Sequence, residues 1–423
     1  MGEAPAASRG STSASTVWQA TDHGLDEDWR NWSGSLRFRP SQVEAPAGEG
    51  DLAALVRRCA SEGRTIRPIG AAHSSTPIIA TDDLLVSLEK LSGLCTHDKA
   101  RARATLGAGT ELKKAGDMLL EVGLSMPNFG DVATQRVGGA MGTGTHGSGR
   151  TLNNLSMPLV GGRLVTATGD VRSFTCEQDP DFVRALRVSF GTLGILTDAQ
   201  LQLEPAAELH RQEWCTTLDE CLPRLDHLAD ENRNFDFYWY PRSDEVKLRC
   251  LNRPGKSADY SHFARLTEDR TGYPHQVIPK HGGLAYMFEE MEYAVPAEMG
   301  VECFRKVRQR IIEKWRRTVG WRVLYRFTKA DDSWLSTAHG RETVTISLHQ
   351  NATLPWEDYF ADIEPIFRDC DGRPHWAKKH SLTAAELRPL YPKWDAFIDL
   401  RRRMDPDGVF LTPWLRRLLG VSA

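Results

Sequence analysis

The chain lacks several features that mark common classes of protein. None of its eight cysteines stands in a C-x-x-C pair, which argues against a zinc site, a redox dithiol or a disulfide framework. We interpret these cysteines as reduced, mostly buried thiols of a cytoplasmic protein, and we expect no metal site. No apolar run approaches the length that spans a bilayer, so we expect no transmembrane segment.

An excess of charge of one sign is also missing. The 423 residues contain 53 Lys and Arg against 56 Asp and Glu, a net charge of −3, with no long block of one sign. This balance gives no reason to expect nucleic acid or a membrane surface as a partner. We expect a small neutral or anionic ligand, and the oligomeric state stays open.

Residues 1–17 are rich in Ala, Ser and Gly but lack the apolar core of a signal peptide, so we predict a disordered leader. The length of the remainder is typical of two or more domains. After about Pro205 the pattern changes from glycine-bearing loops to alternating aromatic and charged segments, which are typical of strands in a second domain.

The apolar spacing predicts a mixture of helices and strands throughout. In the first half we expect helices at about 52–63 and 111–122, strands at 65–69, 84–88 and 101–106, and a hairpin over 164–174 that turns at Gly169 and Asp170. In the second half we expect strands at 235–240, 291–296 and 343–349, a helix at 303–316 and a helical span from about Ala384.

One stretch, 67–75 (RPIGAAHSS), has the composition of a loop that holds a large anionic ligand. Gly70, Ala71 and Ala72 let the backbone approach a ligand closely, and consecutive N–H groups in such a turn suit a diphosphate. His73 would then lie among phosphates or against a ring system. A surface turn with an incidental histidine is the alternative.

A second stretch, 138–149, contains six glycines. They are too many for a helix interior, so we predict a loop whose backbone faces a ligand. Their spacing does not match the dinucleotide pattern G-x-G-x-x-G. A flexible linker is the alternative, and the interleaved Met141, Thr143, Thr145 and His146 argue against it. A third loop of small residues, 188–196, suggests that one extended ligand contacts all three segments.

Seven motifs, in this order, resemble those of the FAD-linked aldonolactone and alditol oxidases of the vanillyl-alcohol-oxidase class of flavoproteins. They are Gly70-x-x-His73-Ser74, Gly138-Gly139 followed by Gly144-Thr145-His146-Gly147, Phe190-Gly191-x-Leu193-Gly194, Met291-Glu292-Tyr293-x-Val295-Pro296, Asp332-x-Trp334-Leu335-Ser336, Arg373-Pro374-His375-Trp376-x-Lys378 and Asp405-Pro406-x-Gly408-x-Phe410-Leu411. The resemblance extends over nearly the whole chain from about Trp29.

The resemblance implies a two-domain α+β flavoprotein. We expect an FAD-binding domain of two α+β subdomains at 18–205, a cap domain with an antiparallel sheet at 206–372, and a segment at 373–423 that completes the active site and returns to the FAD domain. The residues expected to contact FAD are Arg67, Gly70, Ala71, Ala72, His73, Ser74, Gly130, Gly138, Gly139, Gly142, Thr143, Gly144, Thr145, His146, Gly147, Gly194, Ile195 and His375.

His73 occupies the position at which this family usually joins a histidine covalently to the flavin 8α-methyl group. A neutral imidazole nitrogen can attack that electrophilic carbon once the flavin is bound, and the bond would prevent cofactor loss. A histidine that only hydrogen-bonds to FAD is the alternative. The resemblance gives His146 a structural role in the second loop rather than a second attachment point.

The chemistry implied by the resemblance is hydride transfer from a substrate C–H to flavin N5 while the adjacent hydroxyl loses its proton. Arg326 and Lys378 correspond to cations of the substrate pocket, and His349 to a further pocket residue. We take these three as catalytic. A surface salt bridge for each cation and a core histidine are the alternatives. The expected substrate is a sugar lactone, with a linear polyol as second choice.

Two positions bear on the substrate and on the oxidant. Leu324 stands where many members carry a glutamate, two residues before the pocket arginine, which leaves the identity of the substrate open. Gly130 stands at a position beside the flavin where a small residue tends to admit dioxygen, so we predict an oxidase that produces hydrogen peroxide. The alternatives are a dehydrogenase with another acceptor, a flavin-binding protein without activity, and a nicotinamide dehydrogenase, which the glycine spacing disfavours.

Overall fold

The computed structural model describes residues 29–279 and 287–422. The predicted leader at 1–17 lies outside these residues. The first part of the chain forms two sheets. The smaller is parallel, in the order β3-β5-β4, with helix α1 (Glu49–Ser61) beside it. Its strands are β3 (Gln42–Glu44), β4 (Ile66–Ile69) and β5 (Leu84–Ser87).

The larger sheet of this first part is antiparallel and has five strands in the order β10-β9-β11-β7-β6. Its strands are β6 (Leu94–Asp98), β7 (Arg103–Gly107), β9 (Leu159–Val165), β10 (Val171–Thr175) and β11 (Ile195–Gln202). The helices of this part are α2 (Leu112–Glu121), α3 (Val137–Gly142) and α4 (Pro180–Leu186). Short pairs join β1 (Trp29–Arg30) to β2 (Arg37–Phe38) and β8 (Leu124–Ser125) to β12 (Glu204–Pro205).

The second part is organised around one antiparallel sheet of eight strands, in the order β16-β13-β15-β14-β18-β19-β17-β20. The strands are β13 (Leu209–Thr217), β14 (Asn234–Tyr240), β15 (Glu245–Asn252), β16 (Arg265–Gly272), β17 (Phe288–Pro296), β18 (Val323–Thr328), β19 (Thr343–Asn351) and β20 (Arg373–Pro374). The helices are α5 (Leu218–Cys221), α6 (Leu225–Glu231), α7 (Pro274–Val277), α8 (Gly300–Arg310) and α9 (Glu357–Arg368).

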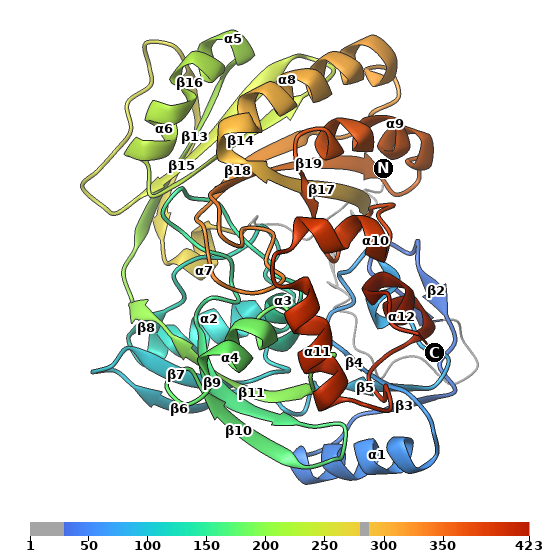
Figure 1. Ribbon diagram of the computed structural model, residues 1–423. Helices are drawn as coiled ribbons and strands as arrows, with labels where there is room; N and C mark the ends of the chain where they lie inside the picture. Colours follow the sequence, from blue (N-terminus) through green and yellow to red (C-terminus); the bar gives the residue numbers. More distant parts are fainter. Residues whose placement is uncertain (1–28, 280–286, 423) are drawn as a thin grey trace, which may run out of the picture.

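Figure 1 shows α5, α6, α8 and α9 on the outer side of this sheet, and the first part of the chain on its other side. Successive side chains of β17 point to opposite faces of the sheet. Tyr293 points outward, where its ring stacks on Phe367 of α9 with the centroids 5.0 Å apart and its hydroxyl donates to Glu364. Glu290 and Glu292 therefore point inward, toward the first part of the chain.

The final segment returns from the sheet to the first part. After β20 it forms α10 (Ala384–Leu387), α11 (Trp394–Met404) and α12 (Pro413–Leu419). The amide of Ile66 in β4 donates to Val409 O at 2.9 Å, and the Arg67 guanidinium donates to Phe410 O at 3.0 Å. The tail is thus bonded directly to β4, the strand that leads into the loop carrying His73.

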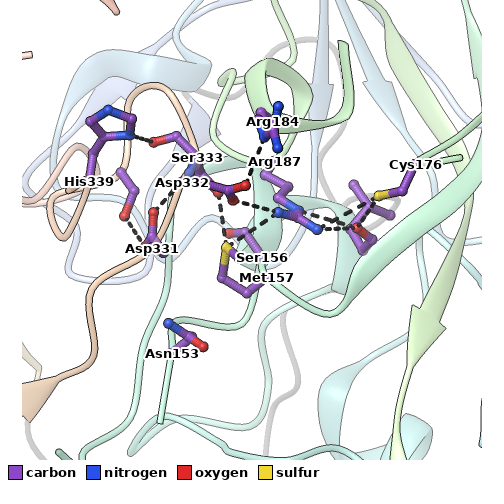
Figure 2. A network of polar contacts seen from close by, with 12 residues as sticks. Asn153, Ser156, Met157, Cys176, Arg184, Arg187, Asp331, Asp332, Ser333 and His339 are labelled. Atoms are coloured by element: carbon purple, nitrogen blue, oxygen red, sulfur yellow. Dashed lines mark hydrogen bonds and ion pairs between the residues drawn. The ribbon is translucent and has the colours of Figure 1, made fainter. Parts of the chain in front are cut away.

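A loop at 331–339, which contains the Asp332-x-Trp334 motif, joins the two parts (Figure 2). Asp332 contacts Arg184 at 2.7 Å and Arg187 at 3.1 Å, both from the end of α4. On its other side the loop holds the tail, because Trp376 Nε1 donates to Leu335 O at 2.7 Å. The loop therefore fixes the tail against the first part of the chain.

Most predicted elements are confirmed, including α1, β4, β5, β7, α2, the β9–β10 hairpin, β14, β17 and β19. The prediction that residues 138–149 contain no helix is wrong, because α3 runs through Gly138, Gly139 and Gly142. It is a short helix that glycine allows to lie close to its neighbour: a Cβ on Gly138 would lie 3.2 Å from that of Ala108.

The predicted helical span from Ala384 is interrupted rather than continuous, since Pro389 and Pro392 lie between α10 and α11. All eight cysteines are free thiols. Among the helices of residues 29–279 and 287–422, none combines the length and the apolar composition needed to cross a membrane. The domain boundaries at 205 and 372 stay predictions.

Candidate functional site

The first cavity lies where the three glycine-bearing segments meet. Its wall includes residues after β4, residues of α3 and residues of the turn that precedes β11. Among the residues predicted to contact the cofactor, those on this wall are Arg67, Gly70, Ala71, Ala72, His73, Ser74, Gly138, Gly139, Gly142, Thr143, Gly194 and Ile195. The structure therefore brings together three segments that lie far apart in the sequence.

Much of this wall is backbone. A Cβ on Gly139 would meet nothing within 4 Å, and one on Gly142 would have its nearest neighbour at 3.9 Å, so a ligand can approach the main chain there. Ala72 and Phe190 have φ values of 53° and 56°, a left-handed conformation that is uncommon for residues other than glycine. Such strained residues concentrate at ligand sites, and both lie on this wall.

Arg67 shapes the cavity from within the protein. Its guanidinium donates to Phe190 O at 2.6 Å and to Phe410 O at 3.0 Å, and burial lowers its pKa to about 10. These contacts tie β4 to the turn before β11 and to the tail.

His73 lies at the junction of this cavity with a second one and is on the wall of both. Its ring stacks on Trp32 with the centroids 4.5 Å apart. Burial, reinforced by the charge of Lys378, lowers the pKa of His73 to about 4, so the imidazole is neutral at pH 7. Its Nε2 is buried and has no hydrogen-bond partner among the described residues. An orphaned ring nitrogen at the edge of a cavity walled by main chain and small residues fits direct contact with a flavin.

The second cavity lies between the first part of the chain and the inner face of the eight-stranded sheet. It contains all three predicted catalytic residues and the cofactor-site residues that the first cavity lacks, apart from Gly144 and Gly147. These are Arg326, His349, Lys378, Gly130, Thr145, His146 and His375, and Leu324 lies on the same wall. The two cavities share His73, Ser74 and Gln135, which makes them adjoining chambers.

Glu292 is the centre of an inner cluster of charges. Its carboxylate accepts hydrogen bonds from Arg326, from Ser347 and from His146 Nε2, the last at 2.7 Å. Burial alone would raise the pKa of Glu292, but Arg326 and His146 hold it well below its usual value. All of the carboxylate's partners are cationic or neutral donors, so it is ionised and fully engaged.

Glu290 is the centre of an outer cluster, two residues earlier on β17. It forms an ion pair with Lys378 and lies 3.3 Å from His349 Nε2. Against the effect of burial, Lys378 and His349 lower the pKa of Glu290 far below its usual value. Burial lowers the pKa of His349. Lys378 Nζ can donate three hydrogen bonds, so its contact with Glu290 leaves donors for a ligand.

His146, Glu292 and His375 place one potential metal-ligand atom each within 4.8 Å of the others. The charges argue against a cation, because the Arg326 guanidinium already occupies the carboxylate. His375 Nδ1 accepts the Ala377 amide at 3.2 Å, and burial lowers the pKa of His375 to about 3. Its ring is therefore neutral, with the proton on Nε2.

Two predicted cofactor residues, Gly144 and Gly147, lie on neither wall. Gly144 has a φ of 70° and packs near Val188, and a Cβ on Gly147 would collide with Phe129 O and the Asn128 side chain. Glycine at both positions satisfies packing and backbone geometry.

Glu290 and Trp32 lie on the cavity wall but were not predicted as site residues. A signal for Glu290 is present in the sequence, because three acidic residues, at 289, 290 and 292, stand in a strand whose other residues are apolar or aromatic. Trp32 carries no such signal, since its contact with His73 depends on how two distant loops meet.

Comparisons with known proteins agree with this geometry. The family profile described as D-arabinono-1,4-lactone oxidase matches residues 199–274 and 281–418, and the profile of an FAD binding domain matches residues 40–175. The L-gulono-1,4-lactone dehydrogenase of Mycobacterium tuberculosis is 35% identical over 93% of this chain and 99% of its own length. The L-gulonolactone oxidase of Scyliorhinus torazame is 26% identical over 92% and 97%.

The crystal structure of cholesterol oxidase from Brevibacterium sterolicum has the same fold. It superposes with a TM-score of 0.80 at 16% sequence identity and covers 95% of this chain and 99% of its own. The adjoining cavities, the FAD binding domain profile and the matched relatives lead to one assignment. This chain belongs to the D-arabinono-1,4-lactone oxidase family of FAD-binding proteins.

Proposed function

We propose that this protein is an FAD-dependent oxidoreductase that oxidises a hydroxyl-bearing carbon of an aldono-1,4-lactone. The observation that carries the proposal is the meeting of two different cavities at His73, one walled by backbone and small residues and the other by ionised side chains. The first suits an extended cofactor, and the second suits a ligand rich in hydroxyls. The names of the matched relatives, which are lactone oxidases and a lactone dehydrogenase, support the same substrate class.

The flavin, when bound, supplies a hydride acceptor. The chain must then hold the substrate and manage its charge. Lys378 is a cation on the cavity wall with spare donors, so it binds a substrate oxygen and offsets negative charge that develops during oxidation. Arg326 donates to Glu292 and to His146 O, so it holds this cluster in place. It contributes its positive charge without contacting the substrate.

We propose further that His73 is bonded covalently to the flavin. Its neutral ring is a competent nucleophile, its stacking on Trp32 restricts its orientation, and its Nε2 has no competing partner among the described residues. These features support an 8α-histidyl bond over a hydrogen bond alone.

For the electron acceptor we propose dioxygen, which would yield hydrogen peroxide. Gly130 supports this choice, because it lies on the cavity wall and a Cβ there would approach His146 O to 3.3 Å and Thr145 to 3.4 Å. The second candidate is a dehydrogenase with another acceptor, which the name of the relative at 35% identity favours. The eight free cysteines support a reducing, cytoplasmic location.

The test is anaerobic reduction of the bound flavin by a panel of aldonolactones and linear polyols, followed by reoxidation with dioxygen or with a dye. Bleaching by lactones is expected. Reduction by polyols alone would replace the lactone with a polyol substrate, and reoxidation only by the dye would identify a dehydrogenase. A flavin that no compound reduces would point to a binding protein without activity.

A further inference from the structure

The oxidation proposed above releases a proton from the substrate hydroxyl, and the second cavity must contain a group that receives it. Its titratable groups can be compared by the hydrogen bonds they already make. Glu292 accepts three donors, and His146 contacts Gly147 O at 3.0 Å through Nδ1 and Glu292 through Nε2. His375 accepts an amide at Nδ1, so its other nitrogen already carries the proton. Glu292 and His375 therefore offer no free lone pair, and the carboxylate beside His146 is already filled by Arg326 and Ser347.

His349 has the same kinds of neighbour as His146, but its carboxylate is less occupied, because Glu290 pairs with Lys378 whereas Glu292 accepts from both Arg326 and Ser347. The Nδ1 of His349 lies 3.2 Å from Arg322 O, and its Nε2 lies 3.3 Å from the ionised carboxylate of Glu290. Both oxygens can only accept a hydrogen bond. Burial lowers the pKa of His349, so the neutral ring has one proton for two acceptors. One of the two contacts therefore has no proton between its atoms.

We propose that His349 and Glu290 form the proton-accepting pair of this enzyme, an inference that rests on the proposed oxidation. The substrate O–H bond breaks and its proton passes to the pair, where the ring becomes an imidazolium that can donate to both Arg322 O and the Glu290 carboxylate. A bound flavin would supply the acceptor for the hydride that leaves the C–H bond with two electrons, and the carbon would be left as a carbonyl. The alcohol is oxidised, the flavin is reduced, and both hydrogens are accounted for.

The surroundings of the pair fit this role. Lys378 from the tail and Arg322 from the segment before β18 bring positive charge, which keeps the pair free of a proton until substrate arrives. Phe288 packs edge-on against the His349 ring, 5.0 Å between centroids, and keeps it in place. The imidazolium that forms is stabilised by the adjacent Glu290 carboxylate. The two groups titrate as one unit, so a pH profile reports on the pair.

The same strand supplies a matched control. Glu289 forms an ion pair with Lys379 at 3.2 Å, as Glu290 does with Lys378, but neither Glu289 nor Lys379 lies on the cavity wall. Strand parity sends neighbouring side chains to opposite faces of the sheet. Glu289→Gln therefore removes a buried, lysine-paired carboxylate of the same strand without touching the cavity.

The experiment measures anaerobic flavin reduction by a lactone over a range of pH in wild type, His349→Gln, Glu290→Gln and Glu289→Gln. We expect His349→Gln to slow reduction by about 10²–10⁴-fold and to remove the ionisation that limits the wild-type rate at low pH. Glu290→Gln should slow reduction less and move that ionisation, and Glu289→Gln should keep the wild-type rate and profile. Wild-type rates and profile in His349→Gln would overturn the proposal.

A second measurement is independent of turnover and of variant folding. Histidine ¹⁵N NMR of the wild-type holoprotein, with the His349 signals identified by their absence from His349→Gln, reports which ring nitrogen carries the proton. A neutral ring at pH 7, with a proton on one nitrogen only, is expected. A charged ring, with protons on both nitrogens, would overturn the proposal. If no lactone reduces the wild-type flavin, the proposed function fails, and the NMR result still decides the state of the pair.

Discussion

The two cavities that meet at His73 are built in opposite ways. The wall of the first consists largely of main chain, with Gly139 and Gly142 leaving space for a ligand and Ala72 and Phe190 in left-handed conformations. The wall of the second includes ionised side chains from the inner face of the eight-stranded sheet, Glu290, Glu292 and Arg326, together with Lys378 from the tail. The first cavity therefore depends on local backbone geometry, and the second depends on long-range pairing of charges.

The largest effect is expected at His73, which lies on the wall of both cavities. Substitution of His73 by alanine should abolish any covalent link to FAD, which is an all-or-none effect. The measurement is acid precipitation: wild-type pellets should stay yellow, whereas the flavin of the variant should appear in the supernatant. A His146→Ala variant serves as the comparison, because we assign no bond to His146. Wild-type protein that releases all of its FAD would contradict the covalent link.

The charged wall should be sensitive to the loss of one member of a pair. Glu292→Gln leaves Arg326 and His146 buried around a neutral group, and breaking a buried ion pair typically costs about 3–5 kcal/mol. Denaturant unfolding of the holoprotein measures the loss in the free energy of unfolding. Glu302→Gln, which removes an exposed partner of Lys306 on α8, should leave the free energy of unfolding nearly unchanged. Equal losses in the free energy of unfolding for the two variants would refute this distinction between buried and exposed ion pairs.

Substitution of Lys378 should affect flavin reduction without affecting FAD binding. Lys378→Ala should slow anaerobic flavin reduction by about 10²–10³-fold, because a preorganised cation is lost where charge develops. FAD content should stay at the wild-type level, since Lys378 lines only the second cavity. Lys379→Ala, on the other face of the sheet, is the control. An unchanged reduction rate in Lys378→Ala would remove its proposed chemical role.

Acid should weaken the fold through its buried neutral histidines. Burial lowers the pKa of His375 to about 3 and of His380 to about 4, whereas an unfolded histidine binds its proton near pH 6.5. The unfolded chain therefore holds more protons below pH 6.5, and the free energy of unfolding falls as pH decreases. At pH 5 the loss is about 2 kcal/mol for each histidine. Thermal unfolding at pH 8 and pH 5 measures it, and His380→Phe should make the difference smaller.

The backbone wall should respond to a single methyl group. Gly139→Ala adds a Cβ that meets no protein atom within 4 Å and so projects into the space expected for the cofactor. In a His73→Ala background, FAD affinity should fall about tenfold, equivalent to about 1.4 kcal/mol. The free energy of unfolding should not fall, because alanine is more favourable than glycine in a helix by about 1 kcal/mol. Gly50→Ala in α1, equally unobstructed but remote, should leave FAD affinity unchanged.

The same contrast explains what the sequence could reveal. The backbone wall was recognisable because a main chain that must approach a ligand requires small residues locally, so 67–75 and 138–149 could be identified without a structure. The short helix α3 was missed because its glycines serve close packing against Ala108, a tertiary contact that overrides helix propensity.

The charged wall was harder to predict, because its partners are distant in the chain. Lys378 and Glu290 are 88 residues apart, and their contact arises because Lys379 N donates to Glu290 O at 2.8 Å and sets the tail beside β17. Lys378, Arg326 and His349 were identified only through family resemblance. Leu324 removes an acid from β18, yet Glu290 places one on the same cavity wall from β17, a compensation that only the folded sheet reveals.

The bond between Arg67 and Phe410 has a consequence for biosynthesis. These residues are separated by 343 positions, so the ribosome has made almost all of the described chain before the loop that carries His73 acquires this support. The hydrogen bond from the Ile66 amide to Val409 O likewise forms only after Val409 has been synthesised. A nascent chain without the tail therefore lacks contacts that support this cavity, and we expect capture of the flavin late in synthesis, after the tail has docked.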